Sequence, residues 1–321
     1  MEQKNHSPER GGAPIRRSIF DQPRKAVSGM VYSGAIIGML VISLAFSVTV
    51  AVLSKTLGMT VDEISDTQVY KYFSYVLYQV VYVAVILAFA LIYREKPSAF
   101  GWRKAAHPKY YLIGLVLLFG LMFSFNFVSN AFIAFLKLFG YNLPDSSLPS
   151  LEGGGFIGVL IVVAVLPAVL EETLFRGIIL EGIKDVGTVA ACLLGGALFC
   201  IFHQNPSQTV YQFVCGAAFT LLALRADSLL PTVFIHFVNN AFILFEEKYS
   251  FLGGLPFAGE VTLYVLSALC LLGSLAYLIF FDKRNGRKKE GEIKPFVLSA
   301  LAGILLCVLF WFVNFAGSLG G

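Results

Sequence analysis

The chain has 321 residues, of which 57% are hydrophobic and only 14% are charged, and its mean hydropathy is +0.76. These values lie outside the range of soluble domains and indicate a polytopic membrane protein. The formal net charge is +4, and no nucleic-acid partner is indicated. Five cysteines lie inside apolar runs without Cys-x-x-Cys spacing, so neither a disulfide framework nor a zinc knuckle is expected. They are predicted to be small packing residues: Cys192, Cys200, Cys215, Cys270 and Cys307.

The N-terminal part begins with a polar, basic segment. Residues 1–27 lack an apolar period, which predicts a disordered cytoplasmic tail. The apolar stretch 28–54 is longer than the roughly 7 to 15 residues of a signal-peptide core, so it is predicted to be the first membrane span. Further spans are expected at 72–93 and 110–136.

Glycine, proline and polar residues divide the rest of the chain into further apolar helices. The fourth span contains the apolar run 156–170 and continues into Glu171, Glu172 and Arg176. Five more spans are expected, at 187–204, 209–224, 229–246, 260–281 and 295–316. The predicted fold is therefore an all-α transmembrane bundle of about eight to nine spans.

The distribution of basic residues predicts the orientation. If the N-terminus is cytoplasmic, the positively charged loops all fall on the cytoplasmic side, as the positive-inside rule requires. These loops are 94–109, 181–187, 225–228 and 282–294. The lysines toward the other side are Lys55, Lys71, Lys137 and Lys248. We therefore expect an integral protein of the cell membrane, in contact with membrane lipids.

No linker is long enough to separate two soluble domains, and no internal repeat is visible. The expected organisation is one membrane-embedded unit with a central core. It consists of the tail 1–27, N-terminal spans within 28–150, a core at 151–247 and C-terminal spans within 248–321.

Two adjacent carboxylates and an arginine stand where a lipid-facing helix would exclude them. Ionisable side chains in a membrane helix cost several kcal/mol unless they face the protein interior and are paired. Glu172 and Arg176 are four residues apart, so they share a helix face and can form an ion pair. Glu171 points about 100° away from that face and remains free for chemistry.

Two histidines and an asparagine occur in the apolar segments that follow. His203 comes four residues after Phe199, whose ring can shield the imidazole from lipid, and His236 shares a helix face with Asn240. A lone helix histidine is more often a satisfied core group than a catalyst. Here, however, a common cavity would explain all the buried polar residues at once.

The residue types suit amide hydrolysis. A carboxylate with a histidine can take a proton from water and return it to the leaving amine, while a second histidine and an amide can donate to the oxyanion. Zn²⁺ held by Glu171, His203 and His236, with or without Glu172, would also activate water. Both forms of water activation remain open at this point. A Cys200 thiolate is the weaker alternative, because nothing orients His203 three residues away.

Three ordered motifs carry a family resemblance: Glu171-Glu172-x-x-x-Arg176, Phe199-x-x-x-His203 and His236-x-x-x-Asn240. Together they resemble the CAAX protease and bacteriocin-processing family of intramembrane proteases, which includes the prenyl-protein endopeptidases. The resemblance covers about 70 residues. It implies that Glu171 and His203 activate water, that His236 and Asn240 bind the oxyanion, and that Glu172 and Arg176 hold the site together. Members are described both as metalloproteases and as glutamate-dependent proteases.

Two other classes of function use similar residues. A proton-coupled transporter should show paired broken helices in two halves, and none is visible in the sequence. A non-catalytic immunity or scaffold protein has no need of two bases, an oxyanion pair and an arginine. The leading hypothesis is an endopeptidase that cleaves a membrane-associated or prenylated protein or peptide. A prenylated C-terminus, a signalling peptide and a bacteriocin leader remain open as substrates.

Overall fold

A computed structural model describes residues 24–144, 148–286 and 289–319, and these residues are almost entirely helical. The N-terminal half contains α1 (Arg24–Leu57), α2 (Val61–Ser65), α3 (Gln68–Tyr93), η1 (Pro97–Phe100), α4 (Lys109–Ser124) and α5 (Asn126–Lys137). The fourth predicted span consists of α6 (Gly155–Val159), η2 (Leu160–Val165), α7 (Leu166–Glu172), η3 (Thr173–Ile179), α8 (Leu180–Ile183) and η4 (Lys184–Val186). The remaining elements are α9 (Thr188–Phe202), η5 (Pro206–Gln208), α10 (Thr209–Ala226), α11 (Leu230–Tyr249), α12 (Phe257–Ala276), η6 (Tyr277–Phe281) and α13 (Lys294–Gly317).

The predicted all-α membrane bundle is confirmed. In the described residues, seven helical segments are long and apolar enough to cross a membrane, which indicates an integral membrane protein. The predicted spans 187–204 and 229–246 correspond to α9, which is apolar but shorter, and to α11, which ends in charged residues.

The end of the expected disordered tail was wrong. α1 begins at Arg24, so the last four residues of the expected disordered tail are helical, while the rest of that tail lies outside the described residues. Arg24 and Lys25 both form ion pairs with Asp185, at 2.7 and 3.0 Å, and these contacts stabilise the first turn of α1.

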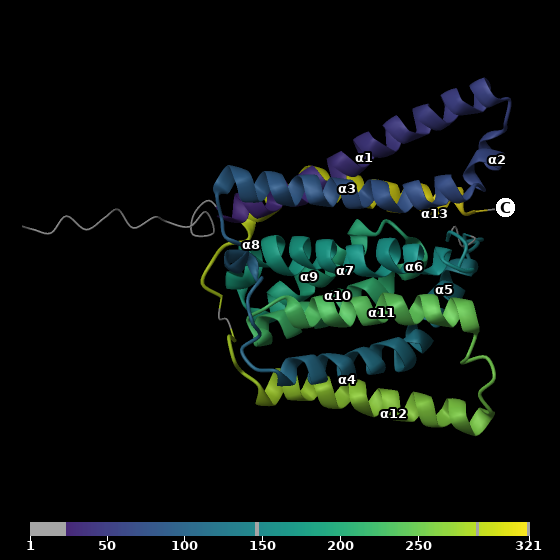
Figure 1. The fold of residues 1–321 in the computed structure, drawn as a ribbon. Helices are drawn as coiled ribbons and strands as arrows, with labels where there is room; N and C mark the ends of the chain where they lie inside the picture. The colour runs from purple at the N-terminus through teal and green to yellow at the C-terminus, as the bar shows by residue number, and fades with distance from the viewer. Residues whose placement is uncertain (1–23, 145–147, 287–288, 320–321) are drawn as a thin grey trace, which may run out of the picture.

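The helices form a bundle with the motif-bearing helices at its centre. Figure 1 shows α1, α3 and α13 along one side, α4 and α12 along the other, and α7, α9, α10 and α11 between them. The degree of burial agrees with this arrangement. The most apolar window of 206–226 is 61% buried, whereas that of α1 is 11% buried. The outer helices therefore present apolar side chains to lipid, while the central helices are enclosed by protein.

Glycines allow the outer helices to pack closely. Ser33 on α1 donates to the carbonyl of Ser299 on α13 and accepts from the backbone N–H of Gly303. On the other side, a Cβ atom on Gly120 of α4 would lie 2.6 Å from backbone atoms of Leu271 on α12. Small residues at such contacts let membrane helices approach at backbone distance.

Candidate active site

The two glutamates lie in the middle of an irregular helical segment. α7 ends at Glu172, and it is flanked by two π-helical stretches, η2 and η3. π-helical turns are rare and are found frequently at functional sites. Pro167 in α7 has no N–H, so the carbonyl of Val163, four residues earlier, lacks its α-helical donor. This segment therefore offers a free backbone acceptor about two helical turns before the carboxylates.

Glu172 and Arg176 form a fully buried ion pair. The Arg176 Nη1 to Glu172 Oε1 distance is 2.8 Å, and the two side chains are 1% and 0% exposed. Arg176 also donates through Nη2 to the carbonyl of Gly216 on α10 at 3.1 Å, and its guanidinium lies 4.5 Å from the Phe199 ring centroid. These additional contacts compensate for part of the desolvation cost of burying two charges.

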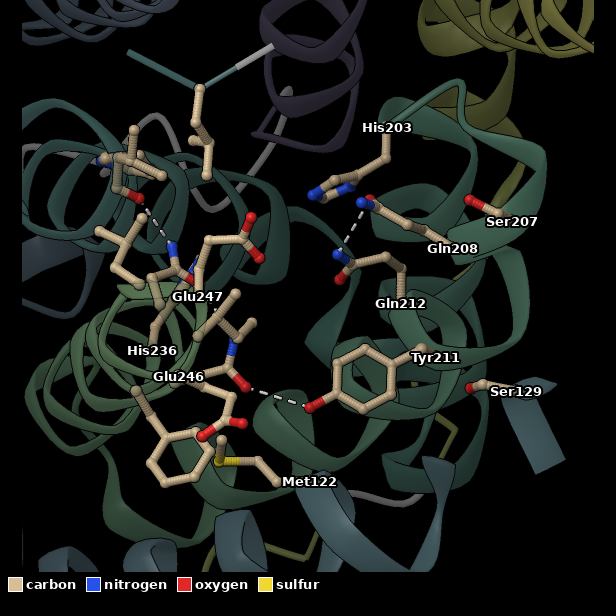
Figure 2. A pocket seen from close by; sticks show the side chains of 18 of the residues that line it. Met122, Ser129, His203, Ser207, Gln208, Tyr211, Gln212, His236, Glu246 and Glu247 are labelled. Carbon is tan, nitrogen blue, oxygen red and sulfur yellow. Dashed lines mark hydrogen bonds between the residues drawn. The ribbon is translucent and has the colours of Figure 1, made fainter. Parts of the chain in front are cut away.

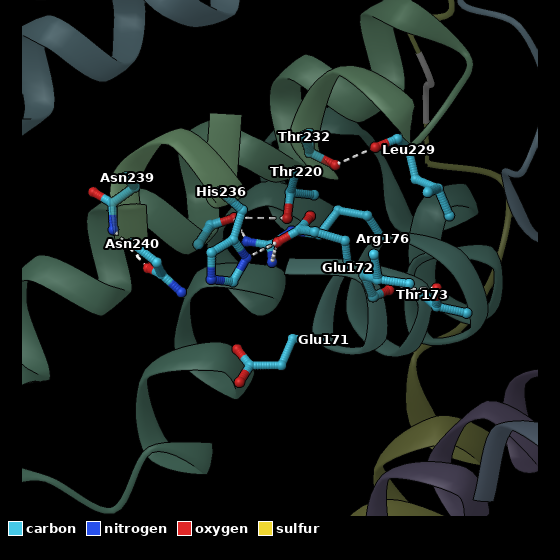
Figure 3. Close-up of polar contacts among 12 residues, drawn as sticks. Glu171, Glu172, Thr173, Arg176, Thr220, Leu229, Thr232, His236, Asn239 and Asn240 are labelled. Atoms are coloured by element: carbon cyan, nitrogen blue, oxygen red, sulfur yellow. Dashed lines mark hydrogen bonds and ion pairs between the residues drawn. The ribbon is translucent and has the colours of Figure 1, made fainter. Parts of the chain in front are cut away.

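Glu172 also binds His236, which the sequence analysis did not anticipate. The His236 Nδ1 lies 2.9 Å from Glu172 Oε1. The same carboxylate oxygen therefore bonds both His236 on α11 and Arg176 on η3 (Figure 3). An ionised Glu172 accepts a hydrogen from Nδ1, because a carboxylate can only accept. The other ring nitrogen, Nε2, is then free to act on a ligand.

Glu171 lies apart from this buried cluster and faces His203 instead. Figure 3 shows its carboxylate separated from the Glu172, Arg176 and His236 contacts. The His203 Nε2 to Glu171 Oε2 distance is 3.9 Å, and the two side chains are 21% and 12% exposed. His203 is the residue immediately after α9, and its Nδ1 lies 2.8 Å from the carbonyl of Phe199. Nδ1 therefore carries the hydrogen and leaves Nε2 as an acceptor facing Glu171.

Asn240 is held by three successive hydrogen bonds. Tyr211 donates to the Asn239 Oδ1 at 3.0 Å, and the Asn239 amide nitrogen donates to the Asn240 Oδ1 at 3.0 Å. The Asn240 Nδ2 donates in turn to the free carbonyl of Val163 at 3.1 Å. A second N–H on the same nitrogen remains available for a ligand.

All four expected catalytic residues line one cavity of about 980 Å³. Glu171, His203, His236 and Asn240 reach it from α7, from the residue after α9, and from α11. Figure 2 shows His236, Glu246 and Glu247 of α11 across the cavity from His203, Tyr211 and Gln212. The supporting residues Glu172, Arg176 and Phe199 lie behind this wall and hold it in place.

The expected metal ligands do not form a metal-binding group. Within the described part of the chain, no set of three His, Cys, Asp or Glu side chains is placed to hold a metal ion. Glu171 faces His203, whereas His236 is bonded to Glu172. Cys200 is buried and is absent from the cavity lining.

Several groups of the site were not predicted from the sequence. The Gly216 and Val163 carbonyls could not be found from side-chain patterns, because backbone acceptors carry no residue signature. Asn239 and its hydrogen-bond donor Tyr211 could have been expected from the sequence, because an Asn-Asn pair in an apolar helix needs hydrogen-bond partners inside the protein.

Comparison with known proteins agrees with the three motifs. Residues 153–242 match the family model described as type II CAAX prenyl endopeptidase Rce1-like. No curated protein and no solved structure matched the chain. The family match supports an intramembrane protease in general terms. Residues 153–242, which contain both glutamates, both histidines and Asn240, form a domain of the Rce1-like type II CAAX prenyl endopeptidase family.

Proposed function

We propose that this protein is an intramembrane endopeptidase that hydrolyses a peptide bond of a membrane-associated or prenylated protein or peptide. One observation carries the proposal. Two acceptors, Glu171 Oε2 and His203 Nε2, face each other across 3.9 Å at the wall of a cavity that His236 and Asn240 also line. Because both groups accept, they can hold the two hydrogens of one water molecule and leave its oxygen lone pairs free to attack.

The reaction then needs only groups of this chain. Glu171 takes a proton from the water as its oxygen attacks the carbonyl carbon, and returns that proton to the leaving nitrogen when the C–N bond breaks. His203 orients the water and accepts its second hydrogen bond. The oxyanion accepts a hydrogen bond from the second N–H of the Asn240 side-chain amide. His236 donates through Nε2 only as an imidazolium, since its Nδ1 hydrogen is directed to Glu172.

The decisive test is Glu171→Gln, with Glu172→Gln as the matched control. We expect Glu171→Gln to fold like the parent but to hydrolyse peptides at least 100-fold more slowly, because general-base catalysis is typically worth about 10² to 10⁴. Glu172→Gln should retain more activity, although its folded yield should fall. The measurement is mass spectrometry of peptides incubated with purified protein in detergent. Near-parental turnover by Glu171→Gln would remove the protease proposal and leave a binding or scaffold role.

Metal dependence can be measured on the same sample. We propose direct activation of water by Glu171 and His203, so activity should survive exhaustive chelation. If Zn²⁺ held the water, chelation would abolish activity and added metal would restore it.

A further inference from the structure

The wall of the active-site cavity is rich in carboxylates. Three carboxylates line it, namely Glu171 beside His203, and Glu246 and Glu247 near the end of α11. Among the described residues that line it, none is a lysine or an arginine. Glu247 is exposed and Glu246 is partly buried, and both line the cavity where α11 ends, which is here called the cavity mouth. A positive group that approaches Glu246 and Glu247 is attracted, and a negative group there is repelled.

One face of α11 connects the mouth to the reacting centre. His236, Asn240, Ile243 and Glu247 recur at spacings of three and four residues, and all four line the cavity. At 1.5 Å per residue, Glu247 lies about 10 Å along the helix from Asn240. An extended peptide covers that distance in about three residues. A side chain about three residues from the scissile bond therefore lies near the mouth carboxylates.

Two buried polar atoms in the cavity wall have no partner in the described structure. Gln79 on α3 and Ser129 on α5 are 7% and 6% exposed and line the cavity. The Gln79 Oε1 and the Ser129 Oγ each lack a hydrogen bond. Buried polar atoms are nearly always bonded, so a small rotation of these two lining side chains toward the cavity would let a ligand with polar groups supply the missing hydrogen bonds. A peptide backbone has N–H and C=O groups for both, whereas an isoprenoid chain has neither.

We propose that this cavity takes a polar, unprenylated peptide segment with a lysine or arginine about three residues from the scissile bond, recognised by Glu246 and Glu247. The inference rests on the proposed function, because it assumes that the bond is cut beside Glu171 and Asn240. A free carboxylate three residues beyond the scissile bond, as in a CAAX C-terminus, is disfavoured, since it would lie near Glu246 and Glu247 and no lysine or arginine of the described lining can pair with it.

The test uses the full-length protein in detergent micelles. A proteome-derived peptide library, read by mass spectrometry, first locates the cleaved bonds. Matched peptides are then compared that differ only in carrying Lys, Ala or Glu near the third residue from that bond. A further peptide carries a farnesylated cysteine and a free C-terminal carboxylate. We expect the Lys peptide to be cleaved at least about tenfold better than the Glu peptide, with a smaller ratio at high salt.

The mouth carboxylates are tested by substitution. Glu247→Gln, and the double variant with Glu246→Gln, should reduce the Lys-over-Glu ratio toward one. Glu260→Gln is the matched control, because Glu260 is an exposed carboxylate near the start of α12 that does not line the cavity. Glu246 accepts a hydrogen bond from the Leu252 N–H, so Glu247→Gln alone keeps the test valid if the double variant folds poorly.

The outcomes separate this inference from the proposed function. Equal cleavage of the Lys and Glu peptides, an unchanged ratio in Glu247→Gln and the double variant, or preference for the farnesylated free-carboxylate peptide would each overturn the inference while leaving the protease intact. If the parent cleaves no peptide, the proposed function fails. Fluorescence anisotropy of labelled Lys and Glu peptides on the Glu171→Gln protein then still decides whether the cavity selects positive charge.

Discussion

Arg176 is the residue whose loss leaves the largest uncompensated charge. Its guanidinium bonds both Glu172 and the Gly216 carbonyl in a fully buried position. We expect Arg176→Ala to lower the free energy of unfolding by about 3 to 5 kcal/mol, because Glu172 would stay buried without its main partner. Thermal unfolding in detergent measures this change.

Two further substitutions are compared with Arg176→Ala: a conservative change at the same position and a change at an exposed lysine. Arg176→Lys should recover only part of the stability, since a single ammonium replaces a planar group that serves two acceptors. Lys104→Ala removes an exposed charge and should leave unfolding unchanged. Parental stability and activity of Arg176→Ala would contradict the buried ion pair.

Tyr211 and Asn239 are expected to act through Asn240. Tyr211→Phe removes the first of the successive hydrogen bonds that orient the Asn240 amide, so kcat should fall about three- to tenfold with little change in KM. Asn239→Ala should cost at least as much. Tyr78→Phe is the matched control, because Tyr78 lines the cavity but its hydroxyl contacts Ser43 on α1. A loss confined to KM would mean that Tyr211 contacts substrate instead.

At the level of elements, the contact between α9 and α10 sets the position of His203. Gly196 and Gly216 lie at this contact, and a Cβ atom on Gly196 would stand 2.5 Å from the Phe213 carbonyl. Gly196→Ala should therefore separate the helices, weaken the Arg176 bond to the Gly216 carbonyl and displace His203. We expect a loss of about 1 to 3 kcal/mol in unfolding free energy together with lower activity.

Gly34 on α1 provides the comparison for this prediction. A Cβ atom there has nothing within 4 Å, so Gly34→Ala should leave activity unchanged and raise stability slightly through helix propensity. Thermal unfolding and peptide hydrolysis, measured side by side for both variants, make the comparison. Equal effects of the two substitutions would show that α9 and α10 do not need their close approach.

For the whole molecule, the two ends of the bundle differ in charge. The basic loops lie at the end where α1 begins, and α1 and α11 finish at the other end (Figure 1), where the cavity-lining residues Glu246, Glu247 and Ser250 are found. The positive-inside rule then predicts that the cavity opens away from the cytoplasm. Ser250→Cys, at the mouth, should react with a membrane-impermeant maleimide on intact cells.

The control position for this labelling experiment lies at the opposite end of the bundle. Ser98→Cys in η1 should react only after permeabilisation, and the parent, with its native cysteines, gives the background. The reverse labelling pattern would place the cavity on the cytoplasmic side and would contradict the predicted orientation.

The sequence alone determined the elements and the local part of the site. Apolar length indicates the membrane helices because hydrocarbon tolerates few other structures, and the observed helix ends differ from the predicted ones by a few residues, as at the starts of α1 and α3. The pairing of Glu172 with Arg176 was also predictable, since residues four apart on a helix are always neighbours.

Only the tertiary structure decided how these pieces meet. The bond from His236 to Glu172 joins residues 64 positions apart, and Asn240 reaches a carbonyl 77 positions away. Helices such as α9 are apolar on nearly every side, so their sequence pattern does not say which face turns inward. That choice depends on where glycines allow close contact and where buried polar groups find partners, and both are properties of the packed bundle.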